Sequence, residues 1–227
     1  MTTEEQVLCC KNAPSIHYGS GDYIHIEPMN LAWVAEVSNT FQFIDRWLAE
    51  NDSTVLQLIP YVILYSPDFR IFSYQRKGGG EKRLDGLMSI GIGGHINPQD
   101  QRTKRKHGGN GIDIGWDTVY QGAIREVIEE IEMSGSYVRS NLKMIGTMYT
   151  PVSQDKQDFK PGPTAGQVHL AVLYALPVEN LGVKVREVDN LVNYKFITSP
   201  SDLTKFERWS QLVWQKMDEI KQLLMPA

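Results

Sequence analysis

Residues 116–133 carry the most regular apolar pattern in the chain. Apolar side chains recur there at steps of three and four residues, which predicts an amphipathic helix with one apolar side. This stripe consists of Tyr120, Ile124, Val127, Ile128 and Ile131. A helix of this kind is stable only when its apolar side packs against another layer. The rest of the chain must therefore supply that layer.

The opposite side of the same helix is acidic. Glu126, Glu129 and Glu130 stand at positions i, i+3 and i+4, so they share one face. Like charges at these spacings destabilise an isolated helix by about a few tenths of a kcal/mol per pair, and Arg125 offsets only part of this. A hard divalent cation such as Mg²⁺, which takes oxygen ligands, would neutralise the cluster. A solvated acidic face is the alternative interpretation of the helix taken alone.

Other segments have the period of strands or helices. Strands are predicted at 23–26, 55–64, 70–76, 87–92, 143–149, 168–176 and 192–197. Residues 30–50 predict one amphipathic helix, or two that are broken near Ser38 and Asn39. Ser199 is expected to cap helices that fill the C-terminus. Residues 97–115 have no period and are expected to form a long loop.

Composition excludes several classes of protein. The 227 residues carry 23 Lys and Arg against 27 Asp and Glu, a net charge of −4, which argues against a nucleic-acid-coating protein. The 41% of hydrophobic residues is enough for a buried core. Cys9 and Cys10 are adjacent and cannot link distant segments through disulfides, so a reducing compartment is expected. The sequence shows neither a secretory leader nor a membrane span, and a cytoplasmic protein is the expectation.

The order of these features resembles the Nudix hydrolase family of MutT-like phosphoesterases. A predicted strand ends in Gly-Gly-His at 93–95, and the helix carries Arg-Glu-Val-Ile-Glu-Glu at 125–130. The family's box runs Gly, five residues, Glu, seven residues, then Arg-Glu-apolar-X-Glu-Glu-X-Gly-apolar. Here Glu132 stands where the family has Gly, and the apolar Met133 follows. The resemblance spans roughly residues 54–200.

The first half of the box can be placed in two ways, and in both of them Asp replaces the family's first Glu. Gly111 and Asp117 fit the spacing without a gap. Gly94 and Asp100 fit the family's context better, because the box follows a strand that ends in Gly-Gly. The second placement, which we prefer, requires an insertion at about residues 101–116.

The resemblance implies an α/β fold, an α/β/α sandwich with a mixed sheet and a catalytic loop and helix. We expect residues 1–53 to form an N-terminal α/β extension and residues 54–227 to form the Nudix-like domain. The implied reaction is hydrolysis of a nucleoside diphosphate linked to another moiety, with Mg²⁺ or Mn²⁺ as the cofactor.

The positions that match the box also imply roles for single residues. Glu129 and Glu130 would be metal ligands, and Glu126 would be a third ligand or the general base. Arg125 would orient Glu129. The four candidate catalytic residues are therefore Arg125, Glu126, Glu129 and Glu130. Gly94 would offer its backbone carbonyl to the metal.

Three further residues are candidates outside the box. Glu187 could supply the additional carboxylate that the family often uses, although a surface loop carboxylate is the simpler interpretation. Arg76 and Lys77 suit substrate phosphates, and a solvated hairpin tip explains them equally well. The basic residues 102–106 of the insertion could close over a substrate, or simply form a surface loop.

Two other functions fit parts of the sequence. A nucleotide-binding sensor of the same fold that has lost hydrolysis would explain the changes at Asp100 or Asp117 and at Glu132. An isopentenyl-diphosphate isomerase would need a cysteine near the Gly-Gly strand, and the chain has cysteines only at 9 and 10. The expected partner is a small nucleotide rather than nucleic acid or membrane, and residues 1–50 or the helix of Trp209 and Trp214 could form a homodimer.

Overall fold

The computed structural model describes residues 5–13, 21–26, 31–78, 82–101, 104–105, 112–152 and 162–225. Its strands are β1 (Gln6–Lys11), β2 (Tyr23–Ile26), β3 (Gln42–Asp45), β4 (Val55–Tyr65), β5 (Ile71–Arg76), β6 (Met88–Ser89), β7 (Gly91–Ile92), β8 (Lys104–Arg105), β9 (Ile112–Asp113), β10 (Lys143–Tyr149), β11 (His169–Pro177) and β12 (Leu191–Ile197). Its α-helices are α1 (Leu31–Ser38), α2 (Arg46–Glu50), α3 (Trp116–Glu130), α4 (Gly135–Asn141), α5 (Ala165–Val168), α6 (Arg208–Gln215) and α7 (Met217–Leu224). The short 3₁₀ helices are η2 (Lys82–Leu84), η3 (Pro98–Asp100) and η4 (Leu203–Lys205).

Ten of the described strands form one mixed sheet with the central order β12-β5-β4-β11-β10-β2. At its margins β1 pairs with β3 and β4, β6 pairs with β5, and β7 pairs with β4. The pairing of β4 with β11 is parallel, and the others are antiparallel. Strands buried on both faces have nearly continuous apolar sequences, which explains the composition of β4 and β11.

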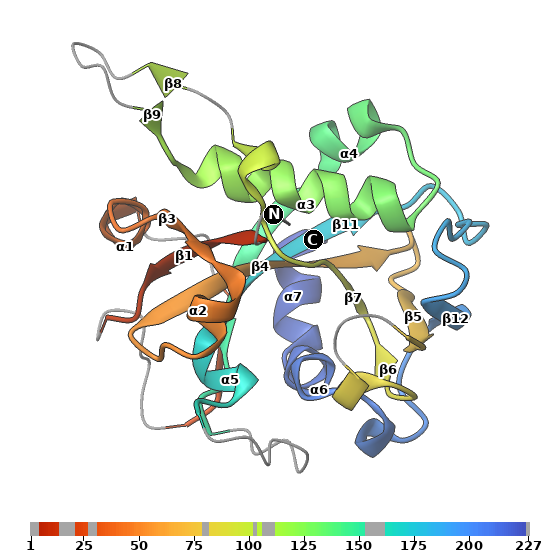
Figure 1. The fold of residues 1–227 in the computed structure, drawn as a ribbon. Coiled ribbons are helices and arrows are strands. Elements are labelled where there is room, and N and C mark those ends of the chain that lie inside the picture. The colour runs from red at the N-terminus through yellow and green to blue at the C-terminus, as the bar shows by residue number, and fades with distance from the viewer. Residues whose placement is uncertain are drawn as a thin grey trace.

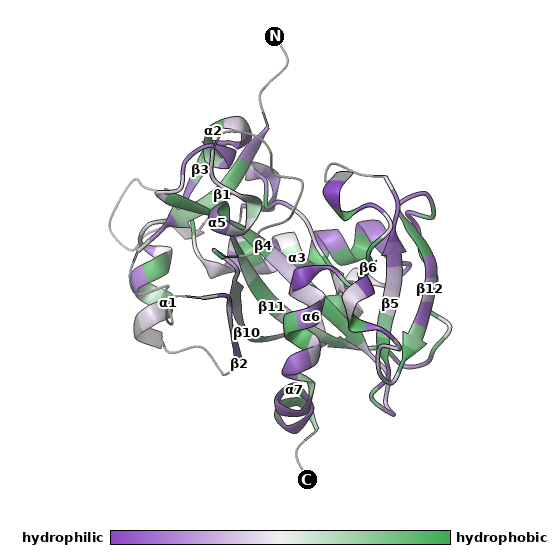
Figure 2. Cartoon of the chain, turned by 90° about the horizontal axis from the view of Figure 1, so that it is seen from below, coloured by the Kyte–Doolittle hydropathy of each residue, from purple (hydrophilic) through white to green (hydrophobic). Residues whose placement is uncertain are grey.

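Helices cover both faces of the sheet, as Figure 1 shows, so the molecule is the expected α/β/α sandwich. Alternate residues of β4 serve the two layers: Leu58 and Val62 join the cluster beneath α3, whereas Ile63 joins the cluster beneath α6 and α7. Figure 2 shows hydrophobic residues along β4 and β11 in the interior. Within the described residues, no helix combines the length and hydrophobicity needed to cross a membrane.

The N-terminal region differs from its prediction. One helix through residues 30–50 is wrong, whereas the alternative break near Ser38 and Asn39 is confirmed, because α1 ends at Ser38. The strand β3 then separates α1 from α2 and replaces part of the second predicted helix. β3 forms because its residues pair with β1, which places Ile44 opposite Val7. The buried strand β1, which the sequence analysis missed, also pairs with β4. Residues before position 53 therefore contribute strands to the main sheet.

Three further boundaries differ from expectation. The strand predicted at 87–92 is divided into β6 and β7, which pair with different partners. The loop predicted at 97–115 contains η3 and the ribbon β8–β9, while residues 102–103 and 106–111 lie outside the described part. Ser199 caps no helix: α6 begins at Arg208, and Asp202 is the residue whose side chain caps η4.

Candidate functional site

Arg125 joins the carboxylate helix to the loop that follows the glycines. Its guanidinium donates to both carboxylate oxygens of Asp100, at 2.8 Å from Nε and 3.0 Å from Nη2. Such two-pronged contacts fix geometry as well as charge. The Asp100 side chain is only 3% exposed and also accepts from the backbone N–H of Asn97. Arg125 Nη2 donates to the carbonyl oxygen of His95 at 2.8 Å, which holds the loop against α3.

The same guanidinium reaches two carboxylates on its own helix. Arg125 Nη1 lies 2.7 Å from Glu129 Oε2 and 2.8 Å from Glu126 Oε1. Arg125 thus contacts Glu129 as the resemblance implied, and it contacts Glu126 as well. Of the two positions considered for the first acid of the box, Asp100 lies at this centre, whereas Asp117 is exposed in the first turn of α3.

The acidic face of α3 is not simply solvated. Glu126 is buried, and burial raises its pKa to about 7; Arg125 opposes this rise, whereas Glu129 and Asp100 add to it. Burial also raises the pKa of Glu130 well above its usual range, and the neighbouring charges of Glu126 and Glu187 contribute to that shift. Glu129 alone of the three is exposed. The alternative interpretation, a solvated acidic face, is therefore wrong for Glu126 and Glu130, because the loop at 93–100 covers this side of the helix.

Glu130 has an unusual environment for a buried acid. Its Oε2 atom is buried and has no hydrogen-bond partner among the described residues. Arg76 is the cation that lowers its pKa. An unpaired carboxylate oxygen among other carboxylates favours a cation from outside the chain. Among the described residues, however, no three His, Cys, Asp or Glu side chains converge closely enough to form a complete metal site.

Gly94 lies directly against this cluster. A Cβ atom at Gly94 would lie 2.8 Å from both carboxylate oxygens of Glu126, a separation that real Cβ atoms do not adopt. With a side chain at this position, the Glu126 carboxylate would have to move away from the loop. The structure therefore brings the backbone of Gly94 next to the candidate ligand Glu126.

Glu187 approaches the helix from another segment. The N–H group of Arg186 donates to the carbonyl oxygen of Glu130 at 2.7 Å, which attaches this segment to the end of α3. Glu187 is exposed, and its negative charge contributes to the raised pKa of Glu130. Its Oε2 accepts a hydrogen bond from Asn190.

The two basic candidates separate in the structure. Arg76 lines a cavity that also borders Gly94 and His95, whereas Lys77 is exposed and is not among the described lining residues. Arg76 Nη1 lies 3.8 Å from Glu207 Oε2 and 3.5 Å from the hydroxyl of Tyr74. Arg76 is thus near Glu207, a buried acid that also lines the cavity, and its charge also acts on Glu130 of α3.

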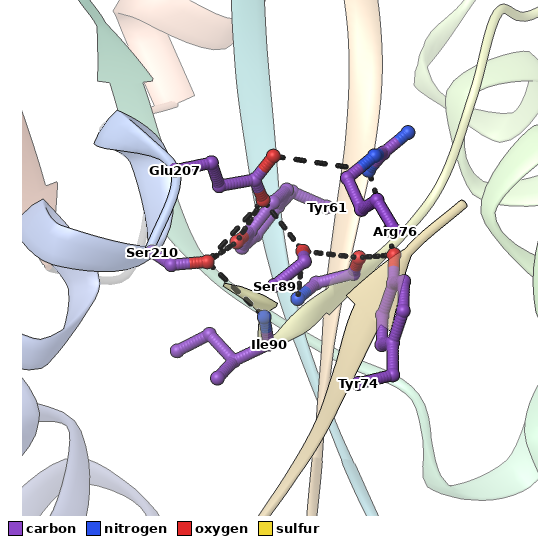
Figure 3. Close-up of polar contacts among 8 residues, drawn as sticks. Tyr61, Tyr74, Arg76, Ser89, Ile90, Glu207 and Ser210 are labelled. Atoms are coloured by element: carbon purple, nitrogen blue, oxygen red, sulfur yellow. Dashed lines mark hydrogen bonds and ion pairs between the residues drawn. The ribbon is translucent and has the colours of Figure 1, made fainter. Parts of the chain in front are cut away.

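Glu207 is a residue of this region that the sequence analysis missed. It precedes α6, is 5% exposed, and its Oε1 accepts hydrogen bonds from Tyr61, Ser89 and Ser210 at 3.0, 2.5 and 3.2 Å (Figure 3). Tyr61 and Ser89 lie 146 and 118 residues away in the chain, so no local pattern signals their contact with Glu207. The C-terminal segment also carries Lys205, Arg208 and Lys216, so no charge pattern singles out Glu207.

The mixed sheet between helical layers, the Gly-Gly loop and the carboxylate helix together define the Nudix fold. The crystal structure of Tm1382, a candidate Nudix hydrolase, superposes with a TM-score of 0.65 over 95% of this chain and 100% of its own, at 21% identity. The chain therefore resembles the Nudix family in its fold as well as in its sequence box.

Particular relatives are distant. Protein YmaB of Bacillus subtilis strain 168 is 26% identical over 186 residues, which are 79% of this chain and 80% of YmaB. The E. coli dihydroneopterin triphosphate pyrophosphohydrolase matches with a TM-score of 0.46 and 17% identity over 78% of this chain and 98% of its own, too weakly to carry an argument. No protein-family model matches the sequence.

Proposed function

We propose that this protein is a divalent-metal-dependent pyrophosphohydrolase that acts on a nucleoside diphosphate linked to another moiety. The observation that carries the proposal is the centre formed by Arg125, Asp100 and the acids of α3, with a buried carboxylate oxygen of Glu130 that lacks a partner among the described residues. The likeness to a Nudix-fold structure supports the proposal, because this centre lies on the loop and helix whose sequence resembles the box of that family.

The residues present fit a hard cation. The unpaired Glu130 oxygen and the mutual repulsion of Glu126 and Glu130 favour one, and Mg²⁺ typically uses one or two carboxylates together with water and substrate phosphates. Glu129, Glu130 and the carbonyl of Gly94 would hold it, with Glu126 as a third ligand or the base. A cation held there supplies charge neutralisation for the diphosphate and a lower pKa for the attacking water.

The protein's own groups then have separate tasks. Arg125 holds Glu129 and Asp100 in place. The absence of a side chain at Gly94 lets the loop lie close to Glu126. Arg76 would bind a phosphate oxygen on the cavity side, and Glu187 would add a carboxylate beyond Glu130. In the reaction, a water oxygen bonds to one phosphorus, the bridging P–O bond breaks, and the departing phosphate gains the bridging oxygen.

The test is a screen of nucleoside diphosphate derivatives with Mg²⁺ and with Mn²⁺ for released phosphate esters. Wild-type protein should hydrolyse at least one compound, and Glu129→Gln and Glu130→Gln should lose that activity. Glu132→Gln is the matched control, because Glu132 follows the helix and forms only an exposed pair with Lys184 at 3.8 Å. Activity that is absent across the panel, or unchanged in both variants, would refute the proposal.

The structure bears differently on the two alternatives. A non-hydrolytic sensor is favoured by Asp100 in place of the first Glu and by Glu132 in place of Gly, and the same screen distinguishes it. The isomerase alternative is disfavoured, because Cys9 and Cys10 are fully buried and burial raises the pKa of each thiol to about 12. A cytoplasmic location, a homodimer and an extension at residues 1–53 stay predictions.

A further inference from the structure

A cavity of about 270 Å³ lies beside the carboxylate centre. Its walls come from β4, β5, the loop at 93–95, and the helices α2, η2, α5 and α6. This volume is at the small end of ligand pockets, so the cavity suits one part of a nucleotide derivative rather than a whole dinucleotide. Gly94 borders both the cavity and Glu126, which makes the two sites neighbours.

Arginines are the prominent charged residues of this cavity. Those that line it are Arg46 from α2, Arg76 from β5, Arg83 from η2 and Arg208 from α6. Glu207 is the acid among the described lining residues. Four guanidinium groups from four separate elements form a site for oxyanions, because each guanidinium presents planar pairs of N–H donors.

Carboxylates hold three of these guanidiniums in place. Arg208 Nε lies 2.9 Å from Asp22. Arg76 Nη1 lies 3.8 Å from Glu207, and Figure 3 shows this pair. Arg46 is fixed through Nε by Glu50 and through Nη1 by Glu5, each at 2.9 Å. A guanidinium has five N–H donors, so each of these groups keeps donors beyond the ones that these contacts use. The carboxylates therefore orient the arginines without exhausting them.

The remaining wall is aromatic and polar. The rings of Tyr61 and Trp209 pack edge to face at 5.7 Å, and both residues line the cavity. His95 also lines it, and its Nε2 atom is buried without a hydrogen-bond partner among the described residues. A ligand with a ring or sugar and an attached phosphate would use all three features. A neutral sugar would leave the arginines without an anion.

We infer that this cavity binds a phosphate group other than the scissile diphosphate, so that the preferred substrates are nucleoside diphosphate derivatives that carry an additional phosphate monoester. The inference rests on the proposed function, because it places the scissile bond at Glu129 and Glu130. Arg76 and Gly94 connect the two sites, since Arg76 interacts with both Glu207 and Glu130. Arg46 from α2 and Arg208 from α6 both line the cavity, and the preference is assigned to these two residues.

The experiment compares two matched pairs of probes, NAD⁺ with NADP⁺ and dephospho-coenzyme A with coenzyme A. Each pair differs by one phosphate monoester. Binding is measured by titration calorimetry on full-length protein in EDTA, and hydrolysis is measured separately with Mg²⁺. In at least one pair the phosphorylated member should bind about tenfold more tightly or better, and Arg46→Gln and Arg208→Gln should each remove most of that preference.

Arg70→Gln is the matched control. Arg70 forms an ion pair with Asp68 at 2.7 Å, as Arg208 does with Asp22, but it lies on an exposed turn and is not among the described lining residues. It should leave the preference intact, and thermal unfolding identifies any variant that fails to fold. Equal binding within both pairs, or a preference that survives both cavity variants, overturns the inference. Hydrolysis without preference would leave the proposed function standing. Preference without hydrolysis would refute the proposed function and leave only the phosphate site in the cavity.

Discussion

Glu130 and Glu207 are two acids withdrawn from solvent near the same arginine, and their surroundings are opposite. Glu207 accepts hydrogen bonds from three hydroxyl groups and lies 3.8 Å from Arg76. Glu130 has an oxygen without a partner among the described residues, and its neighbours Glu126 and Glu187 are also acids. Donors around a buried carboxylate stabilise the fold, whereas acids around one leave it available for a cation. We therefore predict that Glu207 is a structural acid and that Glu130 is a functional one.

The largest effect should follow from Glu130→Gln. Hydrolysis should fall by about a thousandfold, because a ligand of the cation is lost. The thermal midpoint should stay the same or rise, since the substitution removes repulsion from Glu126 and Glu187. Steady-state kinetics and calorimetric unfolding measure the two effects. A lower thermal midpoint together with retained activity would show that Glu130 is a structural acid like Glu207. That result would contradict the distinction between the two residues.

Glu207→Ala should show the reverse pattern. It should lower the free energy of unfolding by about 3 kcal/mol, because it leaves buried hydroxyl groups of Ser89 and Ser210 and the cation of Arg76 without their acceptor. Urea unfolding monitored by circular dichroism measures this change. Glu207→Gln, which keeps an acceptor oxygen, should recover part of the stability. A loss below about 0.5 kcal/mol in the alanine variant would show that this network contributes little.

Two neighbouring glycines, Gly93 and Gly94, should likewise separate an effect on stability from an effect on activity. A Cβ at Gly94 would meet the movable end of the Glu126 side chain at 2.8 Å, whereas a Cβ at Gly93 would clash with the backbone oxygen of Pro60. Gly94→Ala should therefore keep the fold and reduce hydrolysis about tenfold by displacing Glu126. Gly93→Ala should lower the unfolding midpoint instead. Equal effects of the two substitutions on activity and on stability would contradict this assignment.

The smallest effect concerns Cys9 and Cys10. Both are fully buried, and burial raises each thiol pKa from 9.0 to about 12. A folded pKa above the unfolded one adds stability below pH 9 that is lost as the pH rises toward 12. Native protein at pH 8 should react with a disulfide reagent only as fast as it unfolds. Rapid modification of either thiol without unfolding would show that β1 separates from the sheet in the native protein.

Periodicity predicted the parts of the fold that local sequence determines. The helix at 116–130 and the strands at 55–65 and 143–149 follow from residues that each segment contains. β3 depends on pairing with β1, so the four residues Gln42–Asp45 were assigned to a helix. Long-range pairing overrides local propensity in such short strands.

The candidate site was predictable to a similar degree. The spacing of Glu126, Glu129 and Glu130 identified the helix, and the position of Gly94 followed from the box. The burial of Glu126 could not be predicted from the sequence, because it depends on the loop at 93–100, which Arg125 holds against α3. Glu207 could not be found from sequence, since its partners lie on distant strands.

The central claim is that the acids of α3 hold a divalent cation that hydrolysis requires. Electron paramagnetic resonance of Mn²⁺ titrated into the protein with a non-hydrolysable nucleoside diphosphate analogue tests it directly. Wild-type protein and Glu132→Gln should bind the ion with matching affinity, and Glu130→Gln should bind it at least about tenfold more weakly. Equal Mn²⁺ binding by all three proteins, or none by the wild type, would contradict the account.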